Sequence, residues 1–399
     1  MKMRGTSFSV RFGLGVAAAA LAFGYQNCGE FAVDAKNFSQ FASLGATGSG
    51  GAALVPDSDK LDPKCLTSSA YDACLVMQNQ LANSGPVLST DALARQTQLV
   101  AQAIYGVKLT SLSGNGKLEN ATIRVLSLNS PQVATVQAAL KVPPGTANAS
   151  GFEQVNTYYW MNRAAEYFDS RSSGALPAKG KGLQVIVDDT ITGYEAATNT
   201  IRLKSTESGG AIAWNGDVAI HLFGVANLML AHPSGWTSLS NTKHQTCAAI
   251  DKGCCASFNG CASAIRFGVG EYFAASMFPL RTRIGEGLVN SGNPQIIASV
   301  SRDVASLATN TSNQIFADST GNAQAMGILY AAMWWQVRAA AVATRSVDDI
   351  DRIFLEHLTL LDGNDDFRTA FIKAKSVDAR LFSGKHSAKF DAQLTARGL

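Results

Sequence analysis

The pattern of hydrophobic and polar residues predicts strands in the first half of the chain and helices in the second. Residues 121–128, 183–189 and 199–205 are short runs rich in β-branched residues, as strands are, and a turn is expected at Thr192-Gly193 between the last two. Residues 152–169 form a strongly aromatic segment of helical length, and mostly helical segments follow Asp217. This order predicts an α+β fold with a helical second lobe.

A small first domain is predicted over residues 63–145 and a second over 150–399. The first begins with a helical segment at 88–106, which has a Ser/Thr/Asp start and places Leu93, Val100 and Ile104 near one face. The strand at 121–128 and a second at 133–142 follow. The boundary is expected in "PPGTANASG", where two prolines and small residues interrupt regular structure.

Residues 1–27 have the features of an export signal. Lys2, Arg4 and Arg11 precede the short apolar core "FGLGVAAAALAFGY". Cys28 follows where a bacterial lipoprotein carries its acylated cysteine, so we expect a lipid-anchored protein of the cell envelope, in the periplasm or on the outer membrane. The alternative is an ordinary secretory signal with a free or paired Cys28. Residues 28–62 include a Gly/Ala/Ser-rich stretch and are expected to form a flexible tether.

The other six cysteines are disulfide candidates, because exported proteins reside in oxidising surroundings. Six cysteines allow 15 pairings, so the connectivity is not deducible from the sequence. The spacing suggests a local pair near residue 70 and a knotted cluster near residue 255, with zinc as the alternative there if His232 or His244 takes part. The six are Cys65, Cys74, Cys247, Cys254, Cys255 and Cys261.

Composition narrows the function classes only a little. The formal net charge of the 399 residues is +3 and no Lys/Arg-rich run occurs, so nothing in the sequence favours a nucleic-acid partner. There is no G-x-S-x-G, P-loop, dinucleotide fingerprint or EF-hand pattern. No serine-nucleophile or nucleotide-dependent enzyme class is therefore indicated.

The segment "DVAIHLFGVANLMLAH" predicts a buried helix over residues 217–231. It starts after Asn215-Gly216, ends at His232-Pro233 and is apolar almost throughout. Positions 221 and 225 lie one turn apart on the same face, which is where zinc peptidases of the HExxH type place two histidine ligands. Here those positions are His221 and Val225, with Leu222 following the histidine.

Five segments in register resemble the fungalysin/thermolysin-like (gluzincin) metallopeptidases over residues 150–399. "HLFGV" is similar to the family's "HEFGH", and "AIRFGVGEYFAAS" to the helix that carries its third zinc ligand. "VNTYYWMNRAAEYF", "GYEAATNTIRLKS" and "QAMGILYAAMWWQVR" resemble segments before and after these, and the C-terminal tail resembles the family's ending. The resemblance implies a thermolysin-like fold preceded by a propeptide-like domain at 63–145.

Carried over position by position, the resemblance implies a degenerate site. The first ligand remains as His221, the general-base glutamate is Leu222 and the second histidine is Val225. The third ligand corresponds to Phe267 and a downstream histidine to Gln324. Glu271 keeps a carboxylate where the family has aspartate and is a possible remnant acid. Because catalytic zinc needs three protein ligands and an activated water, these replacements predict that no zinc is held and no catalytic set is intact.

Three functions remain open from the sequence. The first is a non-catalytic metallopeptidase-like lipoprotein that binds a peptide or protein. The second is an active zinc metallopeptidase with a rearranged site that uses His221 with Glu271, Asp217 or a histidine of the cysteine-rich loop. The third is a purely structural scaffold. If the first or the third function is correct, His221 is a buried histidine, for which Asp217, one turn earlier, is an available partner.

Overall fold

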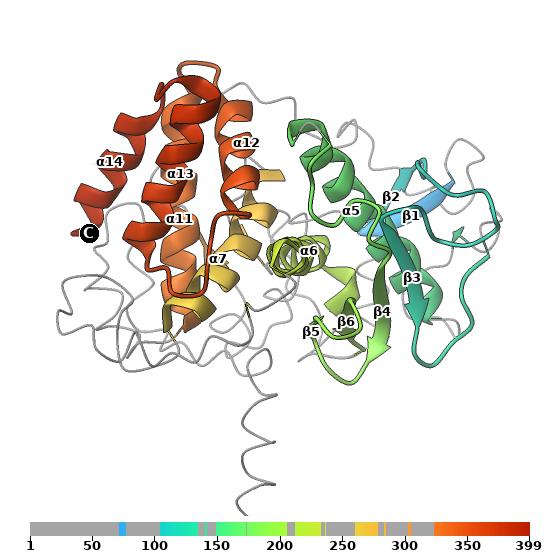
Figure 1. Ribbon diagram of the computed structural model, residues 1–399. Helices are drawn as coiled ribbons and strands as arrows, with labels where there is room; N and C mark the ends of the chain where they lie inside the picture. The colour runs from blue at the N-terminus through green and yellow to red at the C-terminus, as the bar shows by residue number, and fades with distance from the viewer. Residues whose placement is uncertain are drawn as a thin grey trace, which may run out of the picture.

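The computed structural model describes an α+β protein in which helix α6 (Gly216–Ala231) lies between a β-sheet and a group of C-terminal helices (Figure 1). The mixed α+β class predicted from the sequence is therefore confirmed, whereas the domain boundaries stay a prediction. The described residues are 72–76, 104–134, 140–141, 149–172, 174–205, 212–232, 236, 260–277, 283–284, 302–304 and 323–399.

A four-stranded sheet with the order β3-β4-β6-β5 forms the first side of the molecule. Strands β3 (Ile123–Ser127) and β4 (Leu183–Asp189) are parallel, and β4 is parallel to β6 (Thr200–Lys204). The short edge strand β5 (Gly193–Glu195) runs antiparallel to β6. Alternate residues of β4 are buried, which is the pattern expected of a strand with one face on the core.

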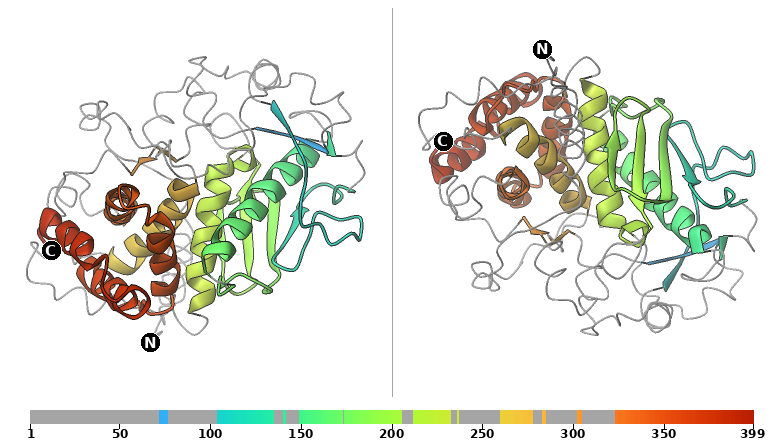
Figure 2. Two further views of the ribbon diagram at one scale, coloured as in Figure 1. Left: turned by 90° about the horizontal axis from the view of Figure 1, so that it is seen from above. Right: turned by 90° about the horizontal axis from the view of Figure 1, so that it is seen from below.

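Helix α5 (Ala149–Arg171) packs on this sheet and joins it to α6 (Figure 2). Its aromatic residues fill the space between the layers, and Tyr158, Trp160 and Phe168 are almost completely buried. Large aromatic side chains supply most of the apolar area that such an interface removes from water. The aromatic segment recognised in the sequence is thus the helix that connects the two sides of the molecule.

Two local predictions were wrong. The helix expected over 88–106 cannot extend to its end, because Ile104–Val107 is strand β2 and pairs with β1 (Ala73–Val76). The turn expected at Thr192-Gly193 between the strands at 183–189 and 199–205 is also wrong, since β5 begins at Gly193 and the two strands are parallel. After β4 the chain crosses to the edge of the sheet, where it forms β5. It then turns back as β6, which lies between β4 and β5. Both errors concern strand pairing, which depends on distant partners.

The position of β3 bears on the predicted domain boundary. β3 precedes residue 145, yet it pairs with β4 along its whole length, from Ile123 beside Leu183 to Ser127 beside Val187. Residues 123–127 therefore belong to the same sheet as the residues that follow 150. Most of the strand expected at 133–142, together with the export signal, Cys28 and the tether, lies outside the described residues.

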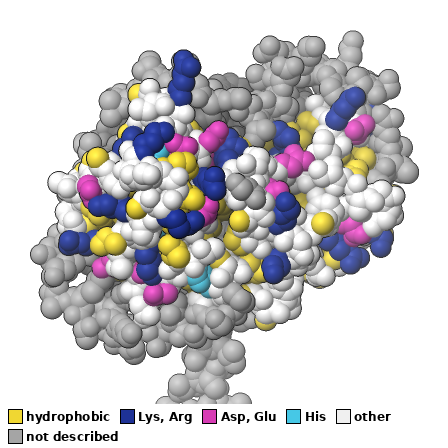
Figure 3. Space-filling view, turned by 45° about the horizontal axis from the view of Figure 1, so that its top comes forward, with side chains coloured by type: hydrophobic (Ala, Val, Ile, Leu, Met, Phe, Trp, Pro, Cys, Tyr) yellow, Lys and Arg dark blue, Asp and Glu magenta, His cyan; other side chains and the backbone are white. Residues whose placement is uncertain are grey.

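The second side of the molecule is helical, as the sequence predicts. The C-terminal helices pack around α7 and α11, and their exposed surfaces carry intermixed acidic and basic side chains (Figure 3). Ion pairs such as Lys385–Asp349 (2.9 Å), which links the turn between α13 and α14 to α12, each have a small stabilising effect. The elements are η2 (Ile212–Trp214), α7 (Gly260–Met277), β7 (Arg283–Ile284), β8 (Arg302–Asp303), α11 (Ala323–Val342), α12 (Val347–His357), α13 (Phe367–Phe382) and α14 (Ser387–Arg397).

Two of the seven cysteines fall in the described part of the chain. Cys74 and Cys261 are fully buried and each is disulfide-bonded, so neither is a free thiol. Cys65, Cys247, Cys254 and Cys255 lie outside the described residues, so the predicted connectivity stays a prediction. Within the described ranges, no helix is both long enough and apolar enough to cross a membrane.

A buried ionic network joins the two sides of the molecule at Asp351 of α12. Tyr167 of α5 and Tyr272 of α7 donate to its carboxylate at 2.9 and 2.8 Å. Arg338 of α11 donates to it at 3.1 Å, and Arg171 of α5 approaches at 3.4 Å. Burial alone would lower the pKa of Arg338, but the Asp351 carboxylate raises it overall, so the guanidinium stays charged. Four helices thus share one fully buried carboxylate.

We expect Asp351→Ala to lower the free energy of unfolding by about 3–5 kcal/mol, because Arg338 would remain buried without its counter-charge. Asp348→Ala is the matched control: Asp348 also pairs with Arg171, at 2.9 Å, but its side chain is 76% exposed. Asp348→Ala should lower the free energy of unfolding by no more than about 1 kcal/mol. Urea denaturation of both variants measures the difference, and equal losses would contradict a dominant role for the buried network.

Candidate functional site

Helix α6 places the first of the predicted site residues in the centre of the molecule. Its residues from Gly216 to Met229 are all buried, so both faces of the helix are covered. It packs against α5 on one side and α7 on the other. His221 is 6% exposed, Leu222 4% and Val225 9%, so the predicted site has little contact with solvent in this part of the helix.

His221 lies beside Glu271 of α7. Its Nδ1 atom is 3.0 Å from Oε1 of Glu271, whose side chain is fully buried. Asp217 had been offered as the partner from its place one turn earlier, but the carboxylate that the structure brings to Nδ1 comes from another helix. An imidazole and a carboxylate at this distance form a buried polar pair, which offsets part of the cost of removing each group from water.

A glycine makes this approach possible. A Cβ atom on Gly270 would lie 2.7 Å from His221 Nδ1 and 2.7 Å from the His221 carbonyl oxygen. Such distances are too short for any side chain, so position 270 must lack one for α7 to lie against the imidazole. Because Glu271 follows directly, the same contact places its carboxylate at the ring.

Phe267 of α7 packs against the ring of His221. Its ring centroid is 4.9 Å from that of His221, in an edge-on arrangement with an interplanar angle of 62°. Phe267 is on α7, one turn before Glu271, and is only partly buried. The structure therefore brings His221, Phe267 and Glu271 together.

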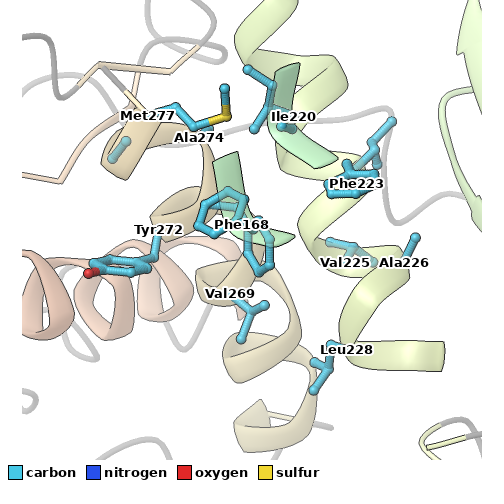
Figure 4. Close-up of a cluster of buried hydrophobic side chains, with 14 of the residues drawn as sticks. Phe168, Ile220, Phe223, Val225, Ala226, Leu228, Val269, Tyr272, Ala274 and Met277 are labelled. Carbon is cyan, nitrogen blue, oxygen red and sulfur yellow. The ribbon is translucent and has the colours of Figure 1, made fainter. Parts of the chain in front are cut away.

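Val225 belongs to an apolar cluster between α6 and α7 (Figure 4). Leu228 of α6 and Val269 of α7 are part of the same cluster, and Phe168 of α5 enters it from a third helix. The helices approach closely here because position 224 is a glycine. A Cβ atom on Gly224 would lie only 2.7 Å from Phe273. Position 225 is thus surrounded by packed hydrocarbon.

Gln324 is placed only by its backbone. It lies in the first turn of α11, and its side chain lies outside the described residues. Gly327, less than one turn later, approaches Phe267: a Cβ atom added to this glycine would lie 2.8 Å from the phenylalanine ring. The start of α11 is therefore next to the predicted site.

Among the residues that the structure describes, the donors around His221 are too few for a catalytic zinc ion. Such an ion takes three nitrogen, oxygen or sulfur ligands from the protein. His221 and Glu271 supply two side chains with donors, while Leu222, Val225 and Phe267 supply none. Nowhere in the described ranges do three or more His, Cys, Asp or Glu side chains form a group able to hold a metal ion. His244, offered for a rearranged site, lies outside these ranges.

Two of the other described histidines, His232 and His357, have structural surroundings. His232 ends α6 as its C-cap residue, and its Nε2 atom contacts the Leu358 carbonyl oxygen. His357 is fully buried, and this burial lowers its pKa to about 3, so the ring is neutral. Tyr330 lies 3.0 Å from its Nε2 atom and can donate to the neutral ring.

Sequence reasoning did not single out several of the buried carboxylates, including two that hold helices in place. Asp351 was not singled out, although it organises the network that joins four helices. Glu153 of α5 was also passed over, and it is 5% exposed with a hydrogen bond from Trp214. Each is one acidic residue within an ordinary helical pattern, so no local signal distinguishes it from a solvent-exposed acid.

Comparisons with known proteins do not place the chain in a family. No family model matches the sequence, and no curated protein matches it. Among solved structures, the chain is similar to the precursor of protealysin, a metalloproteinase from Serratia proteamaculans. The match covers 82% of this chain and 99% of that one, with 10% identical residues and a TM-score of 0.47. A likeness this distant shows neither a family nor an activity.

We expect Gly270→Ala to destabilise the protein by about 1–3 kcal/mol, because the added methyl group would overlap the His221 ring and carbonyl. The gain in helix propensity, about 1 kcal/mol, offsets only part of this cost. Ser263→Ala, at a partly exposed position of the same helix, is the control and should change stability by less than about 0.5 kcal/mol. Thermal unfolding compares them, and a neutral Gly270→Ala would refute the close approach.

Proposed function

We propose that this protein is a non-catalytic member of the metallopeptidase-like α+β proteins, exported to the cell envelope, where it binds a peptide or protein or serves as a scaffold. The observation that carries the proposal is the contact of Phe267 with His221. The resemblance places the third zinc ligand at position 267, and an aromatic ring lies 4.9 Å from the one retained histidine. A former ligand position has therefore become a packing position.

The chemistry of the surrounding residues supports this proposal. Peptide-bond hydrolysis by a zinc peptidase requires a metal-bound water and a base that accepts its proton. Leu222 has no group that accepts a proton, and neither Val225 nor Phe267 has a donor for a metal ion. Replacing two polar ligands and the general base by hydrocarbon also avoids leaving unpaired polar groups in a buried place, which would cost several kcal/mol.

The alternative is an active zinc metallopeptidase with a rearranged site. The close pair of His221 and Glu271, with Nδ1 and Oε1 3.0 Å apart, is the observation that favours it. Such a pair supplies two of three ligands at most, and the third would have to come from a residue beyond those described, such as His244. Zinc would be the cofactor only in this alternative.

The proposed location depends on the N-terminal segment. We infer that residues 1–27 direct export and that Cys28 carries a lipid, which would hold the protein at a membrane surface through the tether of residues 28–62. The basic n-region and the apolar core that end at Cys28 support this. The disulfides expected among the remaining cysteines are consistent with an exported protein.

The proposal predicts that purified mature protein contains far less than one zinc ion per chain and does not hydrolyse peptides. Elemental analysis after dialysis against zinc and then against buffer measures the metal, and a quenched fluorescent peptide library measures hydrolysis. His221→Ala should change neither. His232→Ala is the matched control, at the C-terminal end of the same helix. Stoichiometric zinc that is lost in His221→Ala and kept in His232→Ala would overturn the proposal and favour the rearranged site.

A gain-of-ligand variant tests the position-by-position assignment. Leu222→Glu, Val225→His and Phe267→Glu together should allow about one zinc ion per chain to be retained through gel filtration, because three ligands then converge on one point. The same triple variant with His221→Ala should lose that zinc. Circular dichroism first establishes which variants fold. A folded triple variant without zinc would show that Phe267 does not occupy the third-ligand position.

A further inference from the structure

A buried carboxyl group holds the segment that leads into α6. Glu153, in the second turn of α5, is 5% exposed. Its Oε1 atom accepts a hydrogen bond of 2.6 Å from the indole N–H of Trp214, which is the last residue of η2. α6 begins two residues later, at Gly216. The contact therefore connects α5 to the point where the helix of the candidate site begins.

The second oxygen of Glu153 has no partner. Oε2 is buried and neither accepts nor donates a hydrogen bond. A neutral carboxyl group in such surroundings costs far less than a charged one, since a buried charge needs more than one donor to replace water. Burial raises the pKa of Glu153 to about 7, although its own backbone N–H and Trp214 act in the opposite direction.

The charged neighbours add to this effect. Asp188, at the end of β4, raises the pKa of Glu153 further by repulsion. Its backbone has a φ angle of 60°, which is unusual for a residue other than glycine and accompanies the register shift between β4 and β6. α6 contributes Asp217, which is also acidic and buried in its first turn. On these facing elements, no basic side chain among the described residues acts on Glu153.

Two other contacts hold the same junction without a titratable group. Asn156 of α5 donates to the Ala213 carbonyl oxygen at 2.8 Å. Gly216 lies directly on the Trp160 ring, where a Cβ atom would come within 2.5 Å. The junction between η2 and α6 is therefore held at three points along α5, and Glu153 is the only one of the three whose charge changes with pH.

We propose that the Glu153–Trp214 contact is a proton-sensitive clasp on the start of α6, closed while Glu153 is protonated and loosened when it ionises. Opening moves the carboxylate from buried surroundings to water, where its pKa returns to the ordinary 4.5. The closed form therefore binds the proton more tightly, and rising pH favours opening. This inference is independent of whether the protein binds zinc or hydrolyses peptides.

The direction and size of the effect follow from proton linkage. Below about pH 4.5 the carboxyl group is protonated in both forms, and the clasp has its full strength. Between pH 4.5 and about 7 the opening constant rises by up to tenfold per pH unit, and above about 7 it is constant again. The total change between pH 4.5 and about 7 is up to about 300-fold, of which about 100-fold falls above pH 5.

Hydrogen exchange of the intact protein, followed by mass spectrometry from pH 5 to pH 8.5, tests the clasp. After correction for intrinsic exchange, protection of residues 212–219 should fall by up to about 100-fold, with a midpoint near pH 7, while protection of α13 stays constant. Glu153→Gln removes the ionisation and should make the profile flat. A flat profile in the unaltered protein, or an unchanged slope in Glu153→Gln, would overturn the proposal.

Two further variants keep the test decisive. Glu166→Gln is the matched control on the same helix: burial acts to raise the pKa of Glu166, but hydrogen bonds from Ser111 and Thr110 lower it overall, so this carboxyl is ionised throughout the range. It should leave the profile unchanged. Asp188→Asn removes the repulsion and should move the midpoint to lower pH. If Glu153→Gln does not fold, Asp188→Asn decides the test. A pH midpoint of protection that does not move in Asp188→Asn contradicts the proposed clasp.

Discussion

Helices α6 and α7 can lie against each other only because each has a glycine at the point of contact. Gly224 leaves room for Phe273, and Gly270 leaves room for the ring and carbonyl of His221. The same device recurs between α7 and α11, where a Cβ atom on Gly268 would lie 2.4 Å from the Gly327 carbonyl oxygen. The close approach of α6 and α7 brings Glu271 and Phe267 to His221, and these are the contacts that form the candidate site.

Three buried carboxylates illustrate how the protein manages charge in its interior. Asp351 is surrounded by donors from three helices, including the charged Arg338. Glu271 lies beside an imidazole. Glu153 has one donor from Trp214 and one oxygen without any, and burial raises its pKa to about 7. The fewer the compensating donors, the more the neutral form is favoured. Asp351 is therefore suited to holding helices together, and Glu153 to responding to protons.

The candidate site combines an imidazole–carboxylate pair with hydrocarbon packing. The helix that carries His221 meets the helix that carries Phe267 and Glu271, and the side chains at 222, 225 and 267 have no donor for a metal ion. Leucine, valine and phenylalanine fill volume without requiring hydrogen bonds, so they pack closely around the polar pair.

Much of the element content could be predicted from local pattern. The aromatic helix at 152–169, the helix at 217–231 and the strands at 183–189 and 199–205 are confirmed, since hydrophobic periodicity and end signals act within one segment. The sequence order of motifs also indicated which residues should approach His221. Strand β2, the parallel arrangement of β4 and β6, and the pairing of β3 with β4 were not foreseen, because pairing depends on residues far apart along the chain.

The sequence by itself determined that a buried apolar helix carries His221 and that Leu222 and Val225 follow it without donors, because these are facts of residue identity and spacing. Only the tertiary structure decided that Glu271 lies at Nδ1, that Phe267 packs on the ring, and that Glu153 is buried with a hydrogen bond from Trp214. Whether an acidic side chain is exposed, paired or isolated depends on what other segments place around it. No local pattern contains that information.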